Sequence, residues 1–338
     1  MDSTGGPAAR SPRVVVLGDL VLDVVLSPDR PLRRGTDVAG RVTFRQGGSA
    51  STTARWFARL GMDAALVTAI GADGPGDALV AYLESRGVRV HAVRFAGSRT
   101  GRLGVIVEDG ERSFVADRAA MYLLGPRHLR TSWFAGIALV HLPSYSLVGE
   151  RLAAASARAA RLAKAQGAFV SVDLSSAGFI ASEGPGVMLG RVAALAPDVL
   201  LATDSEAAEA TAGAGLRPLL DIAPVVVIKS GPGGAVARLP GGRSVRVPIR
   251  AMTAIDTTGA GDAFDAGFLA TLVARGVDVE RPRERDIRVA LHGGHRAARR
   301  ELAGRRETLA ITGLAGTVPG DQAARQAGRT GGPGTAAD

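Results

Sequence analysis

A glycine-rich stretch near the carboxyl end of the chain indicates the fold most directly: Asp256-Thr257-Thr258-Gly259-Ala260-Gly261-Asp262-Ala263-Phe264. It lies between an apolar, strand-like region and residues 263–275, which are predicted to form a helix. Small residues at 259–261 let backbone N–H groups converge where that helix begins, and unpaired donors and the helix dipole favour an anion there. Asp262 falls in the first helical turn, beside the expected anion site.

Upstream of this stretch, short apolar strands alternate with helical segments. Strands are expected at residues 14–17, 65–69, 137–141, 169–173, 199–202 and 225–229, and helices at 49–60, 77–86, 149–166 and 205–212. A last helix is expected at 287–302. Because parallel strands need crossover connections, the alternation predicts an α/β fold with a doubly wound, mostly parallel sheet flanked by helices. Ligands should bind beyond the carboxyl ends of its strands.

Two segments, at about residues 30–45 and 93–118, interrupt the alternation. The second contains strand-like pieces at 104–107 and 112–115, joined by the turn-forming Glu108-Asp109-Gly110. These pieces are too short for crossovers and predict a small antiparallel β-lid, which would suit a reaction that must exclude water. Residues 1–12 and 316–338 are expected to be disordered, which leaves 13–315 as one domain.

Composition excludes several classes of protein. The 338 residues include no cysteine, so disulfides, a thiol nucleophile and the usual zinc frameworks are ruled out. The chain has neither an apolar stretch long enough to span a bilayer nor an apolar leader in its first residues, which predicts a cytoplasmic protein with no membrane partner. The net charge of +9 is almost entirely arginine spread along helices, and the dense cluster at 281–306 is interpreted as a solvated helical face. No nucleic-acid partner is therefore expected.

The stretch at 256–264 resembles the second signature of the ribokinase-like (PfkB) carbohydrate and nucleoside kinase family. Further matches in the family's order extend over about residues 14–305. The resemblance implies phosphoryl transfer from ATP with Mg²⁺, an anion hole formed by Gly259, Ala260 and Gly261, and Asp262 as the catalytic base. The structural alternative is a glycine-rich turn in which Asp262 only caps a helix.

The acceptor side of the site rests on two further segments. Residues 18–23 resemble the family's first strand and loop, which implies that Asp23 accepts hydrogen bonds from acceptor hydroxyls. Residues 46–54 resemble the first signature, which implies substrate contacts for Gly47, Gly48 and Thr52. The family commonly has Asn where Thr52 stands, so the identity of the acceptor stays open. Residues 98–101 and 110–114 resemble the lid strands.

The metal and phosphate side rests on residues 203–206 and 229–235. Thr203 and Glu206 stand where the family often has Asn-x-x-Glu, which implies nucleotide binding at Thr203 and a magnesium ion organised by Glu206 through water. First-turn acids that complement a helix dipole are the alternative. Residues 229–235 resemble the nucleotide loop, which implies contacts from Lys229, Gly231 and Gly234, although a lysine that ends a strand is often solvent-facing.

Two weaker correspondences complete the expected site. His292 aligns with a position that borders the adenine in related kinases. Asp256 and Thr258 match positions that hold a monovalent cation such as K⁺ in some members.

The expected function is transfer of a phosphoryl group from ATP·Mg²⁺ to a hydroxymethyl group of a sugar, in the manner of a ribokinase or fructokinase. Two alternatives stay open. One is a nucleoside kinase on the same scaffold, acting on a substrate such as adenosine, cytidine or pseudouridine. The other is a non-catalytic regulatory module that binds sugar or nucleotide. The expected partner is a small sugar or nucleoside, with a homodimer through the lid left open.

Overall fold

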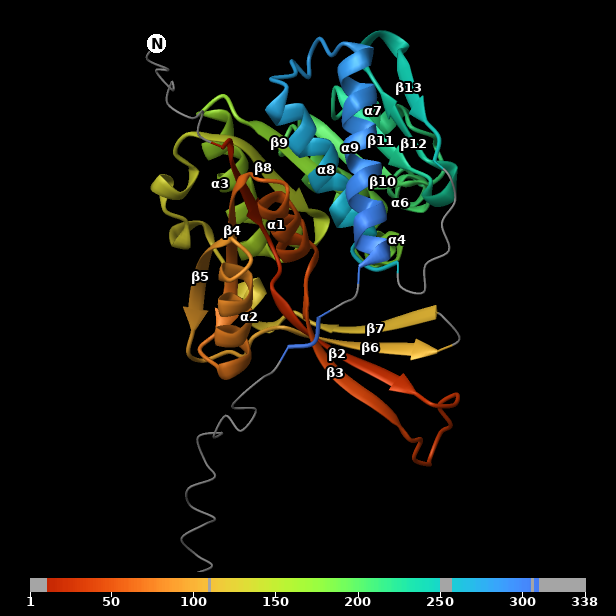
Figure 1. Ribbon diagram of the computed structural model, residues 1–338. Helices are drawn as coiled ribbons and strands as arrows, with labels where there is room; N and C mark the ends of the chain where they lie inside the picture. Colours follow the sequence, from red (N-terminus) through yellow and green to blue (C-terminus); the bar gives the residue numbers. More distant parts are fainter. Residues whose placement is uncertain (1–10, 109–110, 250–256, 305–306, 310–338) are drawn as a thin grey trace, which may run out of the picture.

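The computed structural model describes residues 11–108, 111–249, 257–304 and 307–309 (Figure 1). The disorder expected at the two ends of the chain falls almost entirely on residues 1–10 and 310–338, outside the described part, and so stays a prediction. Asp256 also lies outside it.

A nine-stranded sheet forms the body. In spatial order its strands are β13 (Ser244–Val247), β12 (Ala235–Arg238), β11 (Val225–Lys229), β10 (Val199–Thr203), β9 (Phe169–Asp173), β8 (Ile137–Pro143), β1 (Arg13–Leu17), β4 (Asp63–Gly71) and β5 (Arg89–Phe95). From β11 to β5 every neighbouring pair is parallel, and only β12 and β13 extend the sheet antiparallel. The expected mostly parallel sheet is confirmed.

Helices cover both faces of this sheet. Those on one face are α1 (Ser49–Arg59), α2 (Gly74–Glu84), α8 (Ala260–Ala274) and α9 (Glu284–Ala303). On the other face lie α3 (Glu150–Lys164), α4 (Ala177–Glu183), α5 (Pro185–Ala193), α6 (Asp204–Ala210) and α7 (Arg217–Leu220). Short 3₁₀ turns are η1 (Ala119–Leu123), η2 (Pro126–His128), η3 (Thr131–Phe134), η4 (Ser144–Leu147), η5 (Gly231–Gly233) and η6 (Pro240–Gly242).

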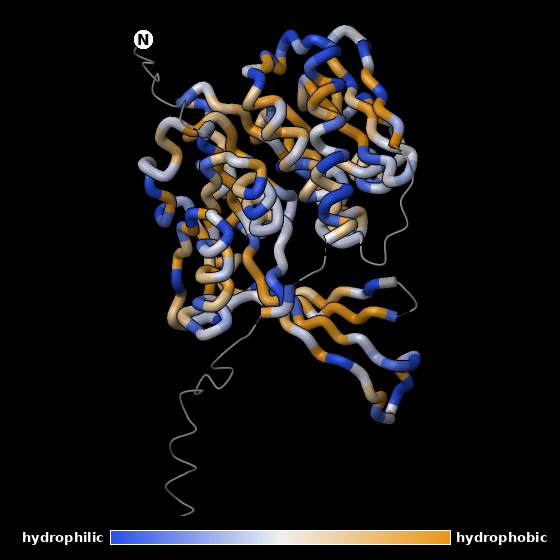
Figure 2. Tube along the Cα trace, in the orientation of Figure 1, coloured by the Kyte–Doolittle hydropathy of each residue, from blue (hydrophilic) through white to orange (hydrophobic). Residues whose placement is uncertain are grey.

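The central strand β1 shows why the sheet is doubly covered. Val14 and Val16 pack into the core beneath α1 and α8, whereas Val15 and Leu17 pack into the core beneath α3. All four side chains are buried, because successive residues of a strand point to opposite faces and helices cover both. Apolar stretches accordingly run through the interior of the body (Figure 2).

A second, four-stranded sheet projects from one end of the body (Figure 1). Its order is β3 (Gly40–Gly47), β2 (Val21–Pro28), β6 (Arg102–Glu108) and β7 (Glu111–Asp117). The β2–β3 and β6–β7 pairs are antiparallel, while the central β2–β6 pair is parallel. We call this sheet the lid.

The boundaries of the lid differ from the expected segments. Residues 93–95 belong to β5, which pairs with β4 in the body, so the second lid segment begins at Arg102. The first segment begins earlier than residue 30, because β2 already starts at Val21. Asp23 therefore sits on a lid strand. The run from 14 to 26 is almost continuously apolar, which hid the passage from one sheet to the other.

Two hydrogen bonds among the described residues join distant body segments to the lid. On β7, Arg112 donates a hydrogen bond to the hydroxyl of Thr258, in the turn before α8. The amide of Leu309, after α9, donates to the carbonyl of Phe44 on β3 at 2.8 Å. Two segments from the carboxyl-terminal part of the domain therefore hold the lid. In the described part of the chain, no helix has both the length and the apolar character needed to cross a membrane.

Candidate active site

A cavity of about 780 Å³ opens where the body meets the lid. Asp173, Thr203 and Lys229 line it, and they are the last residues of three adjacent parallel strands, β9, β10 and β11. Lid residues, among them Asp23 and Leu103, line it from the other side. Its position at the carboxyl ends of the strands agrees with the sequence-based expectation.

The start of α8 forms one wall. Gly259 is the N-cap residue and takes a left-handed conformation with φ of +72°, which a glycine adopts without strain. Gly259, Gly261 and Asp262 all line the cavity. The amide of Ala260 instead donates to the carbonyl of Thr257 at 3.3 Å, so it is already engaged. Of the three residues expected to bind the anion, the two glycines therefore line the cavity. Ala260 is not among the described residues that line it.

Asp262 is partly exposed to the cavity and has a perturbed acidity. The hydroxyl of Ser49, at the start of α1, donates to its Oδ1 at 2.5 Å. Burial raises the pKa of Asp262 to about 7, with Asp173 and Asp19 adding to the rise while Ser49 and Lys229 oppose it. A carboxylate whose pKa lies near neutrality is suited to taking a proton and releasing it again.

The turn from β3 into α1 brings the backbone against Asp23 and Asp19. A Cβ on Gly47 would lie 1.8 Å from Oδ1 of Asp23, and one on Gly48 would lie 2.4 Å from the carbonyl oxygen of Asp19. Gly48 also has φ of +105°. Both positions therefore require glycine, because the backbone packs closely against Asp23 and Asp19, whereas the approach of a substrate to these glycines stays a prediction. Asp19 is fixed in turn, because its Oδ1 accepts from the amide of Ala50 at 3.0 Å.

Thr52 lines the same end of the cavity, on the first turns of α1. Its Oγ1 accepts a long hydrogen bond of 3.4 Å from Nε2 of Gln46, which bonds more closely to Ser51 Oγ at 2.8 Å. Asp23, Gly47, Gly48 and Thr52 are thus brought together as predicted.

Lys229 does not face solvent, and that alternative was wrong. Its Nζ lies 2.7 Å from Oδ1 of Asp173 and 3.0 Å from Oδ1 of Asp265, forming two buried ion pairs. These two carboxylates raise the pKa of Lys229 against the opposing effect of burial. Burial and the charge of Asp173 raise the pKa of Asp265. We call Lys229, Asp173 and Asp265 the ion-pair cluster.

Glu206 and Thr203 form a capping box at the start of α6. The amide of Thr203 donates to Oε2 of Glu206 at 2.8 Å, and the amide of Glu206 donates to Oγ1 of Thr203 at 3.3 Å. Both residues also line the cavity, so capping and access to a ligand coexist. Burial and the nearby Asp173 raise the pKa of Glu206.

Three residues expected at the nucleotide are not among the described residues that line this cavity: Gly231, Gly234 and His292. His292 is exposed on α9. Gly234 has φ of +89°, and a Cβ there would lie 2.3 Å from the carbonyl of Val247, so the packing of β12 on β13 already explains this glycine. Thr258 does line the cavity, and Asp256 lies outside the described residues.

Four residues of the site were missed from the sequence: Ser49, Asp173, Asp265 and Arg118. Asp173 carried a usable signal, since it is an acid at the carboxyl end of a predicted parallel strand. Asp265 lies three residues after Asp262 in an otherwise apolar helix. This spacing predicts that both side chains lie on the same face of the helix. Ser49 and Arg118 depend on contacts between distant segments, which no local pattern reveals.

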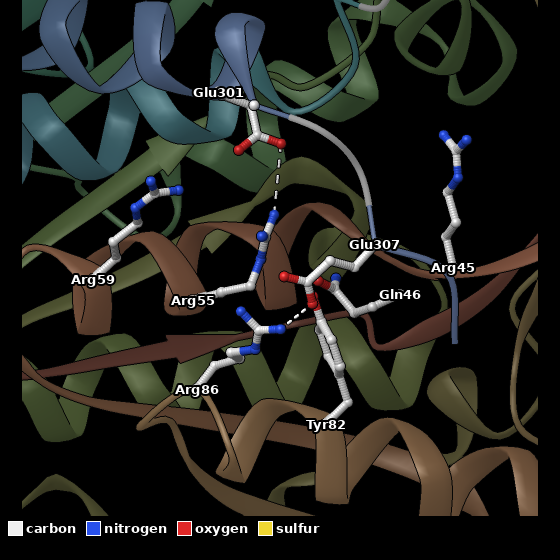
Figure 3. A pocket seen from close by; sticks show the side chains of 9 residues that line it. Arg45, Gln46, Arg55, Arg59, Tyr82, Arg86, Glu301 and Glu307 are labelled. Atoms are coloured by element: carbon white, nitrogen blue, oxygen red, sulfur yellow. Dashed lines mark hydrogen bonds and ion pairs between the residues drawn. The ribbon is translucent and has the colours of Figure 1, made fainter. Parts of the chain in front are cut away.

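A smaller pocket of about 100 Å³ lies on the other side of Gln46, between α1, α2 and the end of α9. Figure 3 shows Arg55 pointing toward Glu301 and Arg86 toward Glu307. The Arg55–Glu301 distance is 3.6 Å. Because Arg55 and Arg86 already face carboxylates and this pocket is much the smaller of the two, the larger cavity is the candidate active site.

Known proteins share this architecture. A profile described as "pfkB family carbohydrate kinase" matches residues 11–299. An ATP-dependent ribose-1-phosphate kinase from Halopiger xanaduensis is 34% identical over 281 residues, covering 80% of this chain and 88% of that protein. A Klebsiella pneumoniae fructokinase is 30% identical, covering 78% and 86%.

Solved structures agree on the fold. The adenosine kinase from Sinorhizobium meliloti superposes with a TM-score of 0.76 at 23% identity, covering 94% of this chain and 100% of that one. Fructokinase from Xylella fastidiosa, with bound ATP, superposes with a TM-score of 0.73 at 24% identity, covering 87% and 93%. Together with the profile match and the identity to curated kinases, these results show that the chain belongs to the PfkB family of carbohydrate kinases and is a sugar or nucleoside kinase.

Proposed function

We propose that this enzyme transfers the γ-phosphoryl group of ATP to a hydroxymethyl group of a sugar, with Asp262 as the catalytic base. The supporting observation is the pairing of a carboxylate whose pKa is near 7 with the glycine-rich helix start in one cavity. A base removes the proton of the attacking hydroxyl, while amides at a helix start stabilise charge on the transferred group. Both groups occur here on the first turn of α8.

The acceptor hydroxyls would be oriented by Asp23. It is buried on β2, against a backbone that has no Cβ at Gly47. A carboxylate can accept from two adjacent hydroxyls, which fixes a sugar more firmly than a single contact would. Positioning of this kind supplies a large share of the rate in phosphoryl transfer.

Two carboxylates that line the cavity, those of Glu206 and Asp173, are suited to holding a magnesium ion. Glu206 and Asp173 both line the cavity, and their mutual repulsion contributes to the raised pKa of Glu206. A divalent cation would relieve this repulsion, and Mg²⁺ needs only one or two carboxylates besides water. When bound it would neutralise charge on the phosphates. Among the described residues no group of three or more potential metal ligands gathers.

The proposed function is tested by acceptor-dependent ADP release. Ribose, fructose, adenosine, cytidine and ribose 1-phosphate would be offered with ATP·Mg²⁺ to the purified enzyme. We expect ADP release to depend on a sugar acceptor and to remain at the background rate with nucleosides. Turnover with adenosine or cytidine alone would favour the nucleoside alternative, and absence of turnover across a wider panel would contradict the proposal.

The pH profile should report Asp262. Because the pKa of the base is raised to about 7, kcat/KM should rise about tenfold per pH unit below that value and level off above it, as expected for a base that must be deprotonated. Ser49→Ala removes the hydrogen bond that favours the carboxylate, so the midpoint should move to higher pH.

The matched control for this shift is Ser182→Ala. The exposed hydroxyl of Ser182 donates to the carbonyl of Phe179 at 2.8 Å within α4, so the midpoint of the Ser182→Ala profile should stay at the wild-type value. A midpoint that is unchanged in Ser49→Ala, or that moves to lower pH, would contradict the assignment of the titration to Asp262.

A further inference from the structure

Arg118 is a buried cation in the wall of the same cavity, and the catalytic proposal does not use it. It follows the end of β7 and is the N-cap residue of η1, and only 6% of its surface is exposed. Arginine remains charged in proteins at all ordinary pH values. A positive charge with this little access to water therefore needs a counter-charge or a comparable partner.

Within the part of the chain that the structure describes, nothing provides a counter-charge. No carboxylate of the described residues lies within ion-pairing distance of Arg118, and its Nε is buried without a hydrogen-bond partner there. The adjacent Asp117 is turned away, because its Oδ2 pairs with Arg99 at 2.7 Å and its Oδ1 accepts from the amide of Ala119. Lys229, the other cation among the described lining residues, is by contrast held by two carboxylates.

Two aromatic rings pack against the guanidinium. Its central carbon lies 4.1 Å from the ring centroid of Tyr145 and 5.6 Å from that of Phe179. Burial raises the pKa of Tyr145 to about 12, so this phenol stays neutral and does not balance the charge. The two rings also contact each other, with centroids 4.8 Å apart. The stacking orients the guanidinium without neutralising it, and it occupies ring surface on which a nucleobase would otherwise stack.

We propose that the acceptor of this kinase is an anionic sugar, whose phosphate or carboxylate group is bound by Arg118. A planar guanidinium held over two rings presents its N–H groups in a fixed fork, which suits two parallel hydrogen bonds to such a group. The lid residues Asp23 and Leu103 line the same cavity, so the anionic end and the hydroxyls of one small sugar are bound together. The proposal rests on the sugar kinase function above and narrows it to acceptors that already carry a negative charge.

The test compares charged and neutral versions of the same sugars. Ribose would be compared with ribose 1-phosphate and ribose 5-phosphate, fructose with its 1- and 6-phosphates, and glucose with gluconate. Turnover and calorimetric binding without ATP would both be measured. The wild type should favour a phosphorylated sugar, or gluconate, by about 100-fold or more in kcat/KM, as expected for a buried charge pair. The phosphate and carboxylate arms distinguish which anion is recognised.

Arg118→Met keeps the apolar packing on the rings and removes the charge. It should raise KM and the calorimetric Kd for the favoured anionic sugar about 100-fold, with little effect on neutral sugars or on KM for ATP. Arg161→Met, which removes an exposed arginine of α3, is the matched control and should behave as the wild type. If Arg118→Met does not fold, Arg118→Lys provides the answer, because it should still prefer charged over neutral sugars while binding the anion more weakly.

The outcomes separate the two proposals. Equal use and equal binding of charged and neutral sugars by the wild type would overturn the role of Arg118, as would an equal loss for both in Arg118→Met. Turnover with neutral sugars alone would overturn it while leaving the sugar kinase intact. Binding of an anionic sugar through Arg118 without ADP release would instead support Arg118 and contradict the kinase proposal.

Discussion

Replacing Asp262 by asparagine should lower kcat by about 1,000-fold, within the range that general-base catalysis contributes. The amide has the same shape and can still accept the hydrogen bond from Ser49, but it cannot take a proton from the acceptor hydroxyl. Binding of ATP should change by no more than about twofold, because the glycine backbone at the start of α8 is untouched. Steady-state kinetics and nucleotide titration measure the two quantities separately.

A matched control is Asp77→Asn, which makes the same change in the first turn of α2, where Asp77 faces Arg94 on the surface. It should keep wild-type turnover within about twofold, since such surface pairs contribute little. If Asp262→Asn retained turnover comparable to this control, Asp262 would not be the base, and the helix-capping alternative would be favoured instead.

Stability gives a second readout for Asp262. Folding raises the pKa of this carboxyl above its unfolded value, so its contribution to stability is present at low pH and is lost as pH rises through about 7. The asparagine variant cannot ionise and escapes that loss. It should therefore melt at a higher temperature relative to wild type at pH 8 than at pH 5, which a pair of calorimetric scans would show. A catalytic carboxylate that is buried for function destabilises the fold when it is ionised, and replacing it by a neutral residue removes this cost.

The sequence predicted the parallel sheet and the glycine-rich turn before α8 because both depend on local patterns. The apolar run at 14–17 and the strand ending at Lys229 are each followed by turn-forming residues, and the glycines at 259 and 261 mark a helix start directly. In such cases the residues that determine the conformation lie within one or two turns of each other. The structure placed all of them as expected.

The parts that could not be predicted depend on contacts between distant segments. The sequence could not decide whether Lys229 faces solvent or contacts a phosphate, because its partners Asp173 and Asp265 come from a different strand and from α8. Asp23 was expected in a loop, because the apolar run contains no sequence signal for the point where the chain leaves one sheet and enters the other. Arg118 had no local signal at all, because its burial follows from Tyr145 and Phe179, which lie far along the chain.

The ion-pair cluster carries the second large expected effect. Lys229→Met should lower the free energy of unfolding by about 3 kcal/mol or more at pH 8, because removing one partner leaves buried carboxylates without compensation. Folding raises the pKa of Lys229, so its stabilising contribution is fully present below the unfolded value of 10.5 and covers the neutral range. Denaturant unfolding followed by circular dichroism measures the difference.

The loss should shrink as the pH falls. Burial already raises the pKa of Asp265, and without the neighbouring ammonium the acids of the cluster take up protons more readily, which removes the uncompensated charge. At pH 5 the variant should therefore lie closer to wild type than at pH 8. A destabilisation that grew on acidification would contradict this account of the cluster.

The chain contains only one other lysine, which provides the control. Lys164 is exposed at the end of α3, where its Nζ donates to the carbonyl of Ala196 at 2.5 Å, and Lys164→Met should change stability by less than about 0.5 kcal/mol. Adding Asp265→Asn to Lys229→Met should recover part of the loss, because one of the two stranded charges is then neutral. A strictly additive double variant would mean that the pair does not interact, whereas partial recovery would show that Lys229 and Asp265 are energetically coupled, as the buried ion pair between them implies.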